Sequence, residues 1–221
     1  MNFDWHYMIE QMPLYKKALL LTLKIGLWGI LLSLIIGLAC SIIQHYRVKV
    51  IRHIIKWYIE ISRNTPLLIQ LFFLYYGLPK IGITMEAETC AIVGLAFLGG
   101  SYMSEAFRSG IEAVPISQIE SGKSIGLSKI QLTRYITLPQ AVSFSIPALG
   151  ANCLFLLKET SIFSGIALLE LTNTTKYLIG MYYKTNESLL MLVIGYIIIL
   201  LPISLILNWL ERRVRYAEFG N

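Results

Sequence analysis

Residues 115–139 read PISQIESGKSIGLSKIQLTRYITLP and form a polar stretch inside a chain that is otherwise mostly apolar. Ser117 and Glu120 have the spacing of a capping box, in which each side chain accepts a backbone N–H at the start of a helix. We therefore expect a helix to begin at Ser117. Gly126 can adopt the left-handed conformation that often ends a helix, so it predicts a tight turn there.

A second short helix is expected directly after this turn. Ser128 and Gln131 repeat the capping-box spacing. The residue before a proline is disfavoured in helical geometry, whereas a proline suits the first turn of a helix. The second helix should therefore stop near Leu138, and a new long helix should start at Pro139.

The composition around this stretch is that of an integral membrane protein. The 221 residues are 56% hydrophobic and only 14% charged, and their mean hydropathy is +0.63. The apolar run that begins at Ala18 is too long for the core of a cleavable signal peptide, so we expect it to remain as a membrane span. The three cysteines stand singly in apolar runs and are expected to be packing residues.

Five apolar runs are long enough to cross a hydrocarbon core, which needs about 20 helical residues. They cover about residues 18–43, 57–78, 89–107, 139–160 and 189–210. Within the third run, Ala96, Gly100 and Ser104 form a small-residue stripe that lets another helix pack closely. The sequence thus predicts an all-α membrane protein, with one transmembrane domain over residues 1–221 and a polar loop at residues 112–138.

Five spans place the two termini on opposite sides, and the basic residues predict which side is cytoplasmic. One side would receive 12 of them and the other 5. The larger group is Arg47, Lys49, Arg52, Lys56, Arg63, Arg108, Lys123, Lys129, Arg134, Arg212, Arg213 and Arg215; the smaller is Lys16, Lys17, Lys80, Lys176 and Lys184. We expect the polar loop and the C-terminus in the cytoplasm and the N-terminus outside. The net charge of +6 is explained by this orientation and does not indicate nucleic-acid binding.

Nucleotide, metal and hydrolytic sites are not expected in this chain. Gly122-Lys123-Ser124 resembles the end of a P-loop, but Ser117 stands where the first glycine is required and no strand precedes it. The three histidines are scattered without metal-ligand or catalytic-triad spacing.

The polar loop resembles the EAA loop of the membrane subunits of bacterial ABC importers. Glu120, Gly126 and Ile136-Thr137-Leu138-Pro139 match the pattern E-A-A, three residues, G, nine residues, I-x-L-P. The chain departs from this pattern at residues 121 and 122, where serine and glycine replace two alanines.

Further segments resemble the polar amino acid branch of this family, which includes histidine, glutamine, arginine and cystine permeases. They are RNTPLLIQLFF at residues 63–73, YMSEAFRSGI at 102–111, LKETS at 157–161 and ERR at 211–213. The resemblance extends over residues 18–215 and implies the type I ABC importer permease fold.

The resemblance also implies partners. A second permease subunit, identical or homologous, would pair with this chain around a central path. Two cytoplasmic ATPase subunits would bind ATP and Mg²⁺ and receive the EAA loops, and an extracytoplasmic binding protein would deliver a polar amino acid. The chain itself would be a transport subunit, neither an enzyme nor a cofactor-binding protein. The alternatives are the same fold importing an opine or a sulfur compound, or a membrane scaffold that does not transport.

The coupling role is expected in the loop itself. Gly126 would set the angle between the two short helices, and Glu120 would face the ATPase. The full set of expected coupling residues is Glu120, Gly126, Leu127, Ile136, Leu138 and Pro139. Purely local folding is the alternative for all of them.

The substrate path is expected where polar residues interrupt the spans. An amino acid carries an ammonium and a carboxylate group, so carboxylate, amide, hydroxyl and amine side chains are all plausible contacts. The candidates are Gln70, Asn152, Lys158, Glu159, Thr160 and Ser161. Gln70 could instead bridge two helices, and Lys158 and Glu159 could simply pair with each other.

Overall fold

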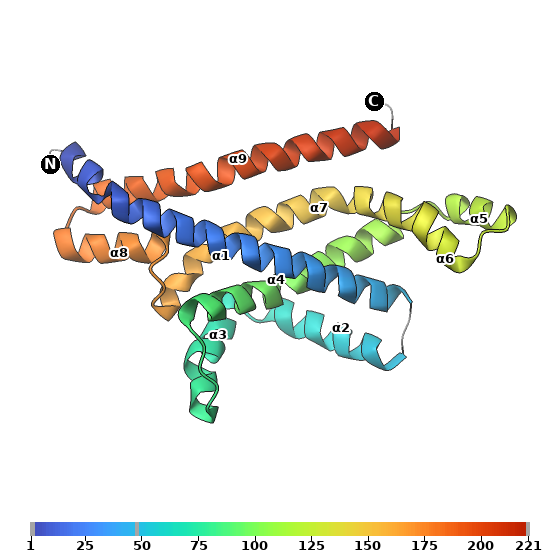
Figure 1. The fold of residues 1–221 in the computed structure, drawn as a ribbon, viewed down its shortest axis with the longest axis horizontal. Helices are drawn as coiled ribbons and strands as arrows, with labels where there is room; N and C mark the ends of the chain where they lie inside the picture. The colour runs from blue at the N-terminus through green and yellow to red at the C-terminus, as the bar shows by residue number, and fades with distance from the viewer. Residues whose placement is uncertain (1–2, 47–48, 220–221) are drawn as a thin grey trace.

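A computed structural model describes residues 3–46 and 49–219 of the protein. Within these residues the chain is helical and has no strand, as the sequence predicts. The α-helices are α1 (Trp5–His45), α2 (Lys49–Asn64), α3 (Leu67–Phe72), α4 (Ala87–Glu112), α5 (Ile116–Ser124), α6 (Lys129–Leu132), α7 (Leu138–Glu159), α8 (Leu171–Tyr182) and α9 (Thr185–Phe219). Short π or 3-10 segments cover Phe73–Gly77, Leu78–Ile81, Thr133–Thr137 and Thr160–Ile166. The long helices α1, α4, α7 and α9 run lengthwise through the molecule (Figure 1).

Four helical stretches in the described residues are long and apolar enough to cross a membrane. They are Trp5–His45, Ala87–Glu112, Lys129–Ile166 and Thr185–Val214. Residues 57–78, expected as one further span, are divided among α2, α3 and the π and 3-10 segments that follow α3. The helix breaks at Pro66, which lacks an N–H and excludes the preceding residue from helical geometry. The helix α8, which lies between the last two long helices, was not expected from the sequence.

The packing of α1 on α4 depends on small residues from both helices. A Cβ at Gly99 would lie 2.1 Å from Ser33 Oγ, and one at Gly37 would lie 2.4 Å from the Cβ of Met103. A Cβ at Gly100, a member of the predicted small-residue stripe, would lie 2.6 Å from a side chain of α1. The helices therefore approach too closely for larger residues, which confirms a packing role for that position.

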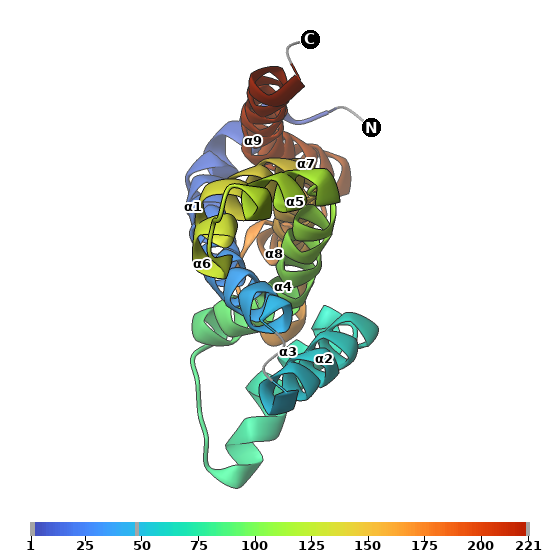
Figure 2. The ribbon, with the colours of Figure 1, turned by 90° about the vertical axis from the view of Figure 1, so that its right-hand side faces the viewer.

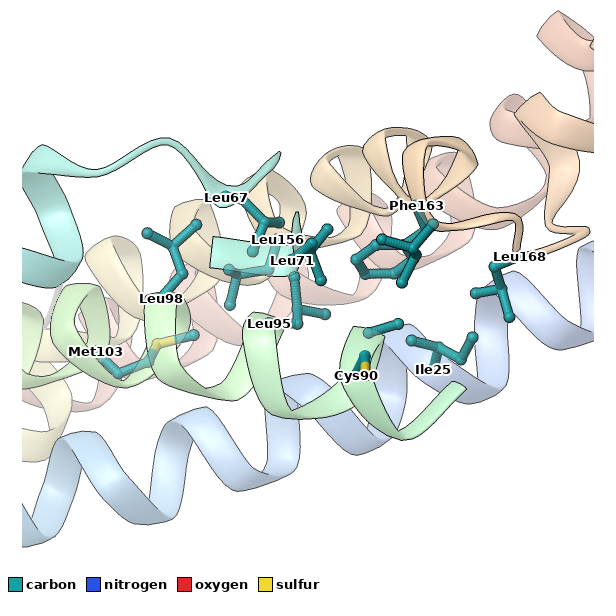
Figure 3. Packing of buried hydrophobic residues seen from close by; sticks show 12 residues of the cluster. Ile25, Leu67, Leu71, Cys90, Leu95, Leu98, Met103, Leu156, Phe163 and Leu168 are labelled. Atoms are coloured by element: carbon teal, nitrogen blue, oxygen red, sulfur yellow. The ribbon is translucent and has the colours of Figure 1, made fainter. Parts of the chain in front are cut away.

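The main apolar core fixes α3 and the 3-10 segment Thr160–Ile166 against the long helices. Its fully buried side chains include Leu71 of α3, Leu95 of α4, Leu156 of α7 and Phe163 of the 3-10 segment. Figure 3 shows Leu71 and Phe163 on the same side of the labelled α4 residues. This packing holds α3 beside α4, whereas α2 packs on α1 through a separate cluster of Cys40, Ile55 and Ile59. Figure 2 shows α2 and α3 together at one edge of the molecule.

The two ends of the long axis carry different structures. The N-terminus, α8 and the start of α9 lie at one end, and α5 and α6 lie at the other (Figure 1). At the first end, Asp4 forms an ion pair with Lys184 at 2.9 Å, and Tyr7 shares a hydrogen bond with Ser188 at 3.0 Å. These contacts fasten the start of α1 to the turn between α8 and α9.

Candidate functional site

The predicted coupling loop begins at α5, which starts earlier than expected. Its first residue is Ile116, and its N-cap is Pro115, without any side-chain cap. The predicted capping box of Ser117 and Glu120 is therefore wrong. Pro115 holds an extended conformation, and its carbonyl already accepts the Gln118 N–H at 3.1 Å, which draws Ser117 into the helix. The Glu120 side chain is left exposed on the surface of the loop.

The turn at Gly126 forms as predicted. Gly126 has φ +84°, in the left-handed region that glycine tolerates. Its N–H donates to the Lys123 carbonyl at 2.9 Å, and the Leu127 N–H donates to the Gly122 carbonyl at 3.1 Å. These two bonds use carbonyls at the end of α5 that would otherwise lack partners.

The capping box at the start of α6 also forms as predicted. The Gln131 N–H donates to Ser128 Oγ at 3.4 Å, and the Ser128 N–H donates to Gln131 Oε1 at 2.9 Å. The short helix α6 is thus closed at its N-terminus by its own side chains, and its direction relative to α5 is set by the preceding turn.

Gly122 explains one departure from the family pattern. It is buried, and a Cβ there would lie 2.5 Å from both Ile136 Cδ1 and Leu132 Cδ2, and 3.5 Å from Leu127 Cδ1. Three apolar side chains therefore close over the bare backbone of α5. The glycine brings α5 nearer to α6 than an alanine would allow, because the side chains occupy the space of the missing methyl group.

The junction with α7 agrees with the prediction in part. The long helix α7 begins at Leu138, next to the predicted start at Pro139, but no break precedes it, because Lys129–Ile166 forms one continuous helical stretch. The Leu138 N–H donates to the Thr133 carbonyl, five residues back, in a π segment. Pro139 has no N–H, and its ring would crowd the carbonyl four residues earlier, so a wider turn accommodates it. The coupling loop is thus joined rigidly to the long helix α7.

Several large apolar side chains of the loop are exposed, which the sequence analysis did not single out. We call them the loop face: Ile116, Ile125, Ile130 and Tyr135, whose exposed fractions are 72%, 78%, 74% and 64%. The sequence did contain a signal for this face, because these apolar residues stand singly in an otherwise polar loop. Exposed apolar groups that gather at one end of a molecule are typical of a protein-binding surface.

Of the expected path residues, Gln70 ties α3 to the end of α2. Its Nε2 donates to the carbonyls of Ser62 and Thr65, both at 3.0 Å. Its Oε1 is buried and has no hydrogen-bond partner among the described residues. Gln70 therefore stabilises the break at Pro66, which favours a bridging role for its amide.

Asn152 lies where α7 meets α4. Its Nδ2 donates to the Tyr102 carbonyl at 3.2 Å. The ring of Tyr102 in turn lies under the guanidinium of Arg63, 5.4 Å from the ring centroid. Asn152 therefore belongs to a group of polar contacts that joins α7, α4 and the end of α2.

The other four expected path residues lie elsewhere, at the end of α7 away from the coupling loop. Lys158 is exposed, Glu159 is half-buried, and they form no ion pair in the part of the chain that the structure describes. Thr160 is buried and donates to the Leu157 carbonyl at 2.7 Å. Ser161 is half-buried. The structure thus separates the six expected path residues into two groups.

A charged group that the sequence analysis did not assign lies beside Asn152 and Tyr102. Arg108 donates to both oxygens of Glu105, at 3.2 and 2.7 Å, and to Glu112 at 2.7 Å. Arg63 of α2 reaches Glu105 at 3.7 Å. The spacing of the charges at 105, 108 and 112, which lie on one face of α4, was the signal for this cluster.

This charged group borders a polar cleft of about 330 Å³ between α1, α2 and α4. The cleft is lined by Gln44, Arg52, Lys56, Ile59, Glu60, Glu105, Arg108 and Glu112. Its volume lies within the range of roughly 300–1,000 Å³ that is common for small-molecule sites. We refer to it below as the polar cleft.

Outside the long helices, one buried carboxyl group stands out electrostatically. Glu170 accepts the N–H groups of Thr172 and Asn173, both at 2.7 Å, and so caps α8. Burial raises the pKa of Glu170 to about 7, although these hydrogen bonds oppose the rise. Through these two hydrogen bonds the Glu170 carboxyl group stabilises the turn that connects the 3-10 segment Thr160–Ile166 to α8.

Comparison with known proteins connects this architecture to transport. Residues 29–216 match the family described as binding-protein-dependent transport system inner membrane component. The chain is 34% identical over 214 residues to the probable amino-acid permease protein YxeN of Bacillus subtilis, and the match covers 96% of each chain. It is 30% identical over 217 residues to the glutamine transport system permease protein GlnP of Escherichia coli, covering 97% of this chain and 99% of that one.

A solved structure leads to the same family. The crystal structure of an amino acid ABC transporter with histidines superposes with a TM-score of 0.90 at 32% identity, over 96% of this chain and 100% of that one. The superposition covers nearly the whole of both chains, which gives this chain the type I ABC importer permease fold. The chain therefore belongs to the family of binding-protein-dependent transport system inner membrane components, and it is a transport subunit, not an enzyme.

Proposed function

We propose that this protein is the transmembrane subunit of an ATP-driven importer that moves a polar amino acid across the cytoplasmic membrane. The observation that carries the proposal is the near-complete superposition on a solved amino acid ABC transporter, at 32% identity. Two relatives that are named for amino-acid or glutamine permeases support the same substrate class.

In this proposal an ATPase subunit docks on the loop face. Ile125 and Ile130 are 78% and 74% exposed and lie on either side of the turn at Gly126. Burying such side chains against a partner contributes about 1.5–3 kcal/mol each. Gly126 and Leu127 hold the angle at which α5 and α6 present these side chains, and Glu120 adds an exposed carboxylate to the same loop.

The continuous junction with α7 supports transmission of movement from the ATPase to the membrane spans. Ile136 packs against α5 over Gly122, while Leu138 and Pro139 continue without a break into α7. A displacement of the loop would therefore move α7 with it as a rigid body. ATP and Mg²⁺ would bind the partner ATPase and not this chain.

The same proposal orients the protein in the membrane. The coupling loop and the C-terminus would lie in the cytoplasm and the N-terminus outside, as the positions of the basic residues favour. The N-terminus lies at the end of the molecule opposite α5 and α6 (Figure 1). An extracytoplasmic binding protein would deliver the cargo at that end, and a second permease subunit would complete the path.

Transport by the reconstituted importer tests the substrate class. The permease, its partner permease, the ATPase and the binding protein are placed in proteoliposomes, and uptake of labelled polar amino acids is measured with and without ATP. We expect ATP-dependent uptake of at least one of them. Failure with every polar amino acid, with an opine or a sulfur compound taken up instead, would overturn the amino acid assignment.

Docking of the ATPase is tested separately with Ile125→Ser and Ile130→Ser. The matched control is Ile81→Ser, because Ile81 is 72% exposed but lies outside the coupling loop. We expect the first two variants to lose co-purification with the ATPase and the control to keep it. Retention of the ATPase by the double variant would contradict docking on the loop face.

A further inference from the structure

A groove lies between α1 and α9 at the end of the molecule that carries the N-terminus. The two helices lie close together at this end and diverge along the molecule (Figure 1). The groove has a volume of about 320 Å³, which is large enough for part of a small ligand. It is lined by side chains from residues 8–19 of α1 and 191–198 of α9, and by Leu171 of α8. We call it the α1–α9 groove.

The floor of this groove is buried, whereas its rim is exposed. Tyr15 and Leu171 are only 6% and 0% exposed and belong to the apolar cluster that packs α1, α8 and α9 together. The Tyr15 hydroxyl donates to the Ser188 carbonyl at 2.8 Å, so its hydrogen bond is made within the chain. On the rim, Met12 and Ile194 are 58% and 42% exposed. An apolar ligand can therefore enter the groove without displacing the core.

Lys16 is the only charged residue among the described residues that line the groove. Its side chain is exposed, and it forms no ion pair within residues 3–46 and 49–219. Two acidic groups at this end of the molecule are engaged elsewhere, because Asp4 pairs with Lys184 and Glu187 accepts the Asp4 N–H at 3.0 Å. The groove thus combines an apolar lining with an ammonium group that has no counter-charge beside it.

The position of the groove favours membrane lipid as its occupant. In both views α9 lies on the flank of the molecule away from α2 and α3 (Figure 1, Figure 2). The charged residues that line the polar cleft belong to the flank of α2 and α4, where a water-filled path would run. Beside the groove, α9 instead exposes Val193, Ile197 and Leu201, each by more than half. An apolar face of this kind on a helix long enough to span a membrane contacts lipid.

Lys16 lies at the depth of a lipid headgroup. It directly precedes the span that the sequence predicts from Ala18 onward. A helical side chain leaves its backbone toward the helix N-terminus, and a long lysine side chain near the end of a span extends to the interface. With the N-terminus outside, as proposed above, this interface belongs to the outer leaflet. The apolar lining at Leu19 and Ile198 lies deeper, where acyl chains run.

We propose that the α1–α9 groove binds one anionic phospholipid, with an acyl chain in the groove and the headgroup phosphate on the Lys16 ammonium group. The flexible side chains of Met8, Met12 and Met191 adapt to the shape of the chain. The phosphate supplies the counter-charge that the groove lacks. A zwitterionic lipid fits less well, because its own cationic group competes with Lys16 for the phosphate.

The bound lipid would also contribute to the packing of the chain. It would contact α1, α8 and α9 together, because the groove is lined by all three helices. These are the elements that the pair of Asp4 with Lys184 already fastens at this end. The site does not depend on which solute the importer moves, so it stands apart from the substrate class proposed above.

Photo-crosslinking on the purified importer complex tests the site. The probe is phosphatidylglycerol with a photoreactive group in one acyl chain, and mass spectrometry of peptides locates the crosslinks. We expect them in residues 8–19 and 191–198. Unlabelled phosphatidylglycerol should compete about fivefold better than phosphatidylcholine with the same chains, which is the effect of one lysine near an anionic headgroup. Glycerol phosphate, which has no acyl chain, should not compete.

Two pairs of variants assign the result to residues. Lys16→Gln should abolish the fivefold preference, whereas Lys17→Gln should keep it, because Lys17 is exposed but does not line the groove. Ile194→Trp should fill the groove from its rim and reduce crosslinking. Its matched control is Ile197→Trp, since Ile197 is 51% exposed on the same helix but lies outside the groove. A ratio of two competitors on one variant does not depend on how much of that variant is folded.

Each outcome decides for or against the site. Crosslinks spread evenly along the exposed face of α9 would overturn the groove, because they would indicate ordinary contact with surrounding lipid. Equal competition by the two phospholipids, or an unchanged preference in Lys16→Gln, would overturn the contact with Lys16. Competition by glycerol phosphate would contradict a site that needs the acyl chain. Crosslinks confined to the groove, with the preference lost in Lys16→Gln and kept in Lys17→Gln, support the proposal.

Discussion

Replacing Gly126 by alanine tests whether the angle between α5 and α6 matters for transport. Gly126 has φ +84°, and a Cβ built on it would meet no atom within 4 Å. The substitution therefore introduces no clash in the isolated chain. The expected cost is instead the conformational strain of an alanine held in the left-handed region, which is about 1–2 kcal/mol.

The turn can escape this strain only by giving up its hydrogen bonds. The Gly126 N–H binds the Lys123 carbonyl, and the Leu127 N–H binds the Gly122 carbonyl. Each bond contributes about 0.5–1.5 kcal/mol, so together they are comparable with the strain. We therefore expect the alanine variant to open the turn more often, with the ratio of closed to open turns reduced by roughly 5- to 30-fold.

Three measurements on the Gly126→Ala variant follow the consequences. Hydrogen exchange of the Leu127 amide should become faster, because that amide is released when the turn opens. The uptake of amino acid per ATP hydrolysed by the proteoliposomes should fall. The melting temperature of the purified chain should stay unchanged, because the turn lies outside the buried cores.

Asparagine at position 126 is the matched control, since it tolerates the left-handed conformation better than alanine. It should keep more of the coupling than alanine does. Unchanged exchange in the Gly126→Ala variant would refute the estimated strain. Faster exchange with normal uptake would refute the link between this turn and transport.

Three further predictions concern stability and the junction with α7. Gly99→Ala should destabilise the protein by about 1–3 kcal/mol in thermal unfolding, because its Cβ would overlap Ser33. The control Gly180→Ala in α8, where a Cβ has open space, should stabilise the protein by about 0.5–1 kcal/mol. Equal effects of the two substitutions would contradict the packing argument. Since the folded pKa of Glu170 is raised from 4.5 to about 7, its contribution to stability should fall by roughly 3 kcal/mol as pH rises between these values. Glu170→Gln should abolish this pH dependence of stability, measured as the melting temperature at each pH. If the melting temperatures of the two proteins change with pH in parallel, the assignment to Glu170 is wrong. Pro139→Ala restores a backbone N–H and should replace the π segment by regular helix, turning α5 and α6 relative to α7; unchanged distances between spin labels on α5 and α9 would speak against this.

The two capping boxes show how far local patterns determine helix ends. Both Ser117 with Glu120 and Ser128 with Gln131 have the required spacing, yet only the second forms. Pro115 decides the difference, because its extended conformation already directs the chain into α5 and leaves no N-cap position for Ser117. The turn at Gly126 was predictable, since it depends on hydrogen bonds within five residues.

The path residues show the limit of the same approach. Gln70 and Asn152 were singled out as isolated polar residues in apolar runs, and the structure connects both to Arg63, one through the backbone beside it and the other through Tyr102. Glu105 was not singled out, because a charge three residues before an arginine on a helix is common on solvated surfaces. Its significance depends on a partner 42 positions earlier in the chain.

The sequence by itself determined that this protein is helical and embedded in a membrane, and that a polar loop with a glycine turn interrupts its spans. These properties follow from composition and from contacts between residues a few positions apart. Only the tertiary structure decided that Gly122 is buried beneath Ile136, that the coupling loop continues into α7, and that Arg63 meets Glu105. Such features depend on how separate helices pack, because the close approach of α1 and α4 and the break at Pro66 place side chains from distant segments within a few ångströms.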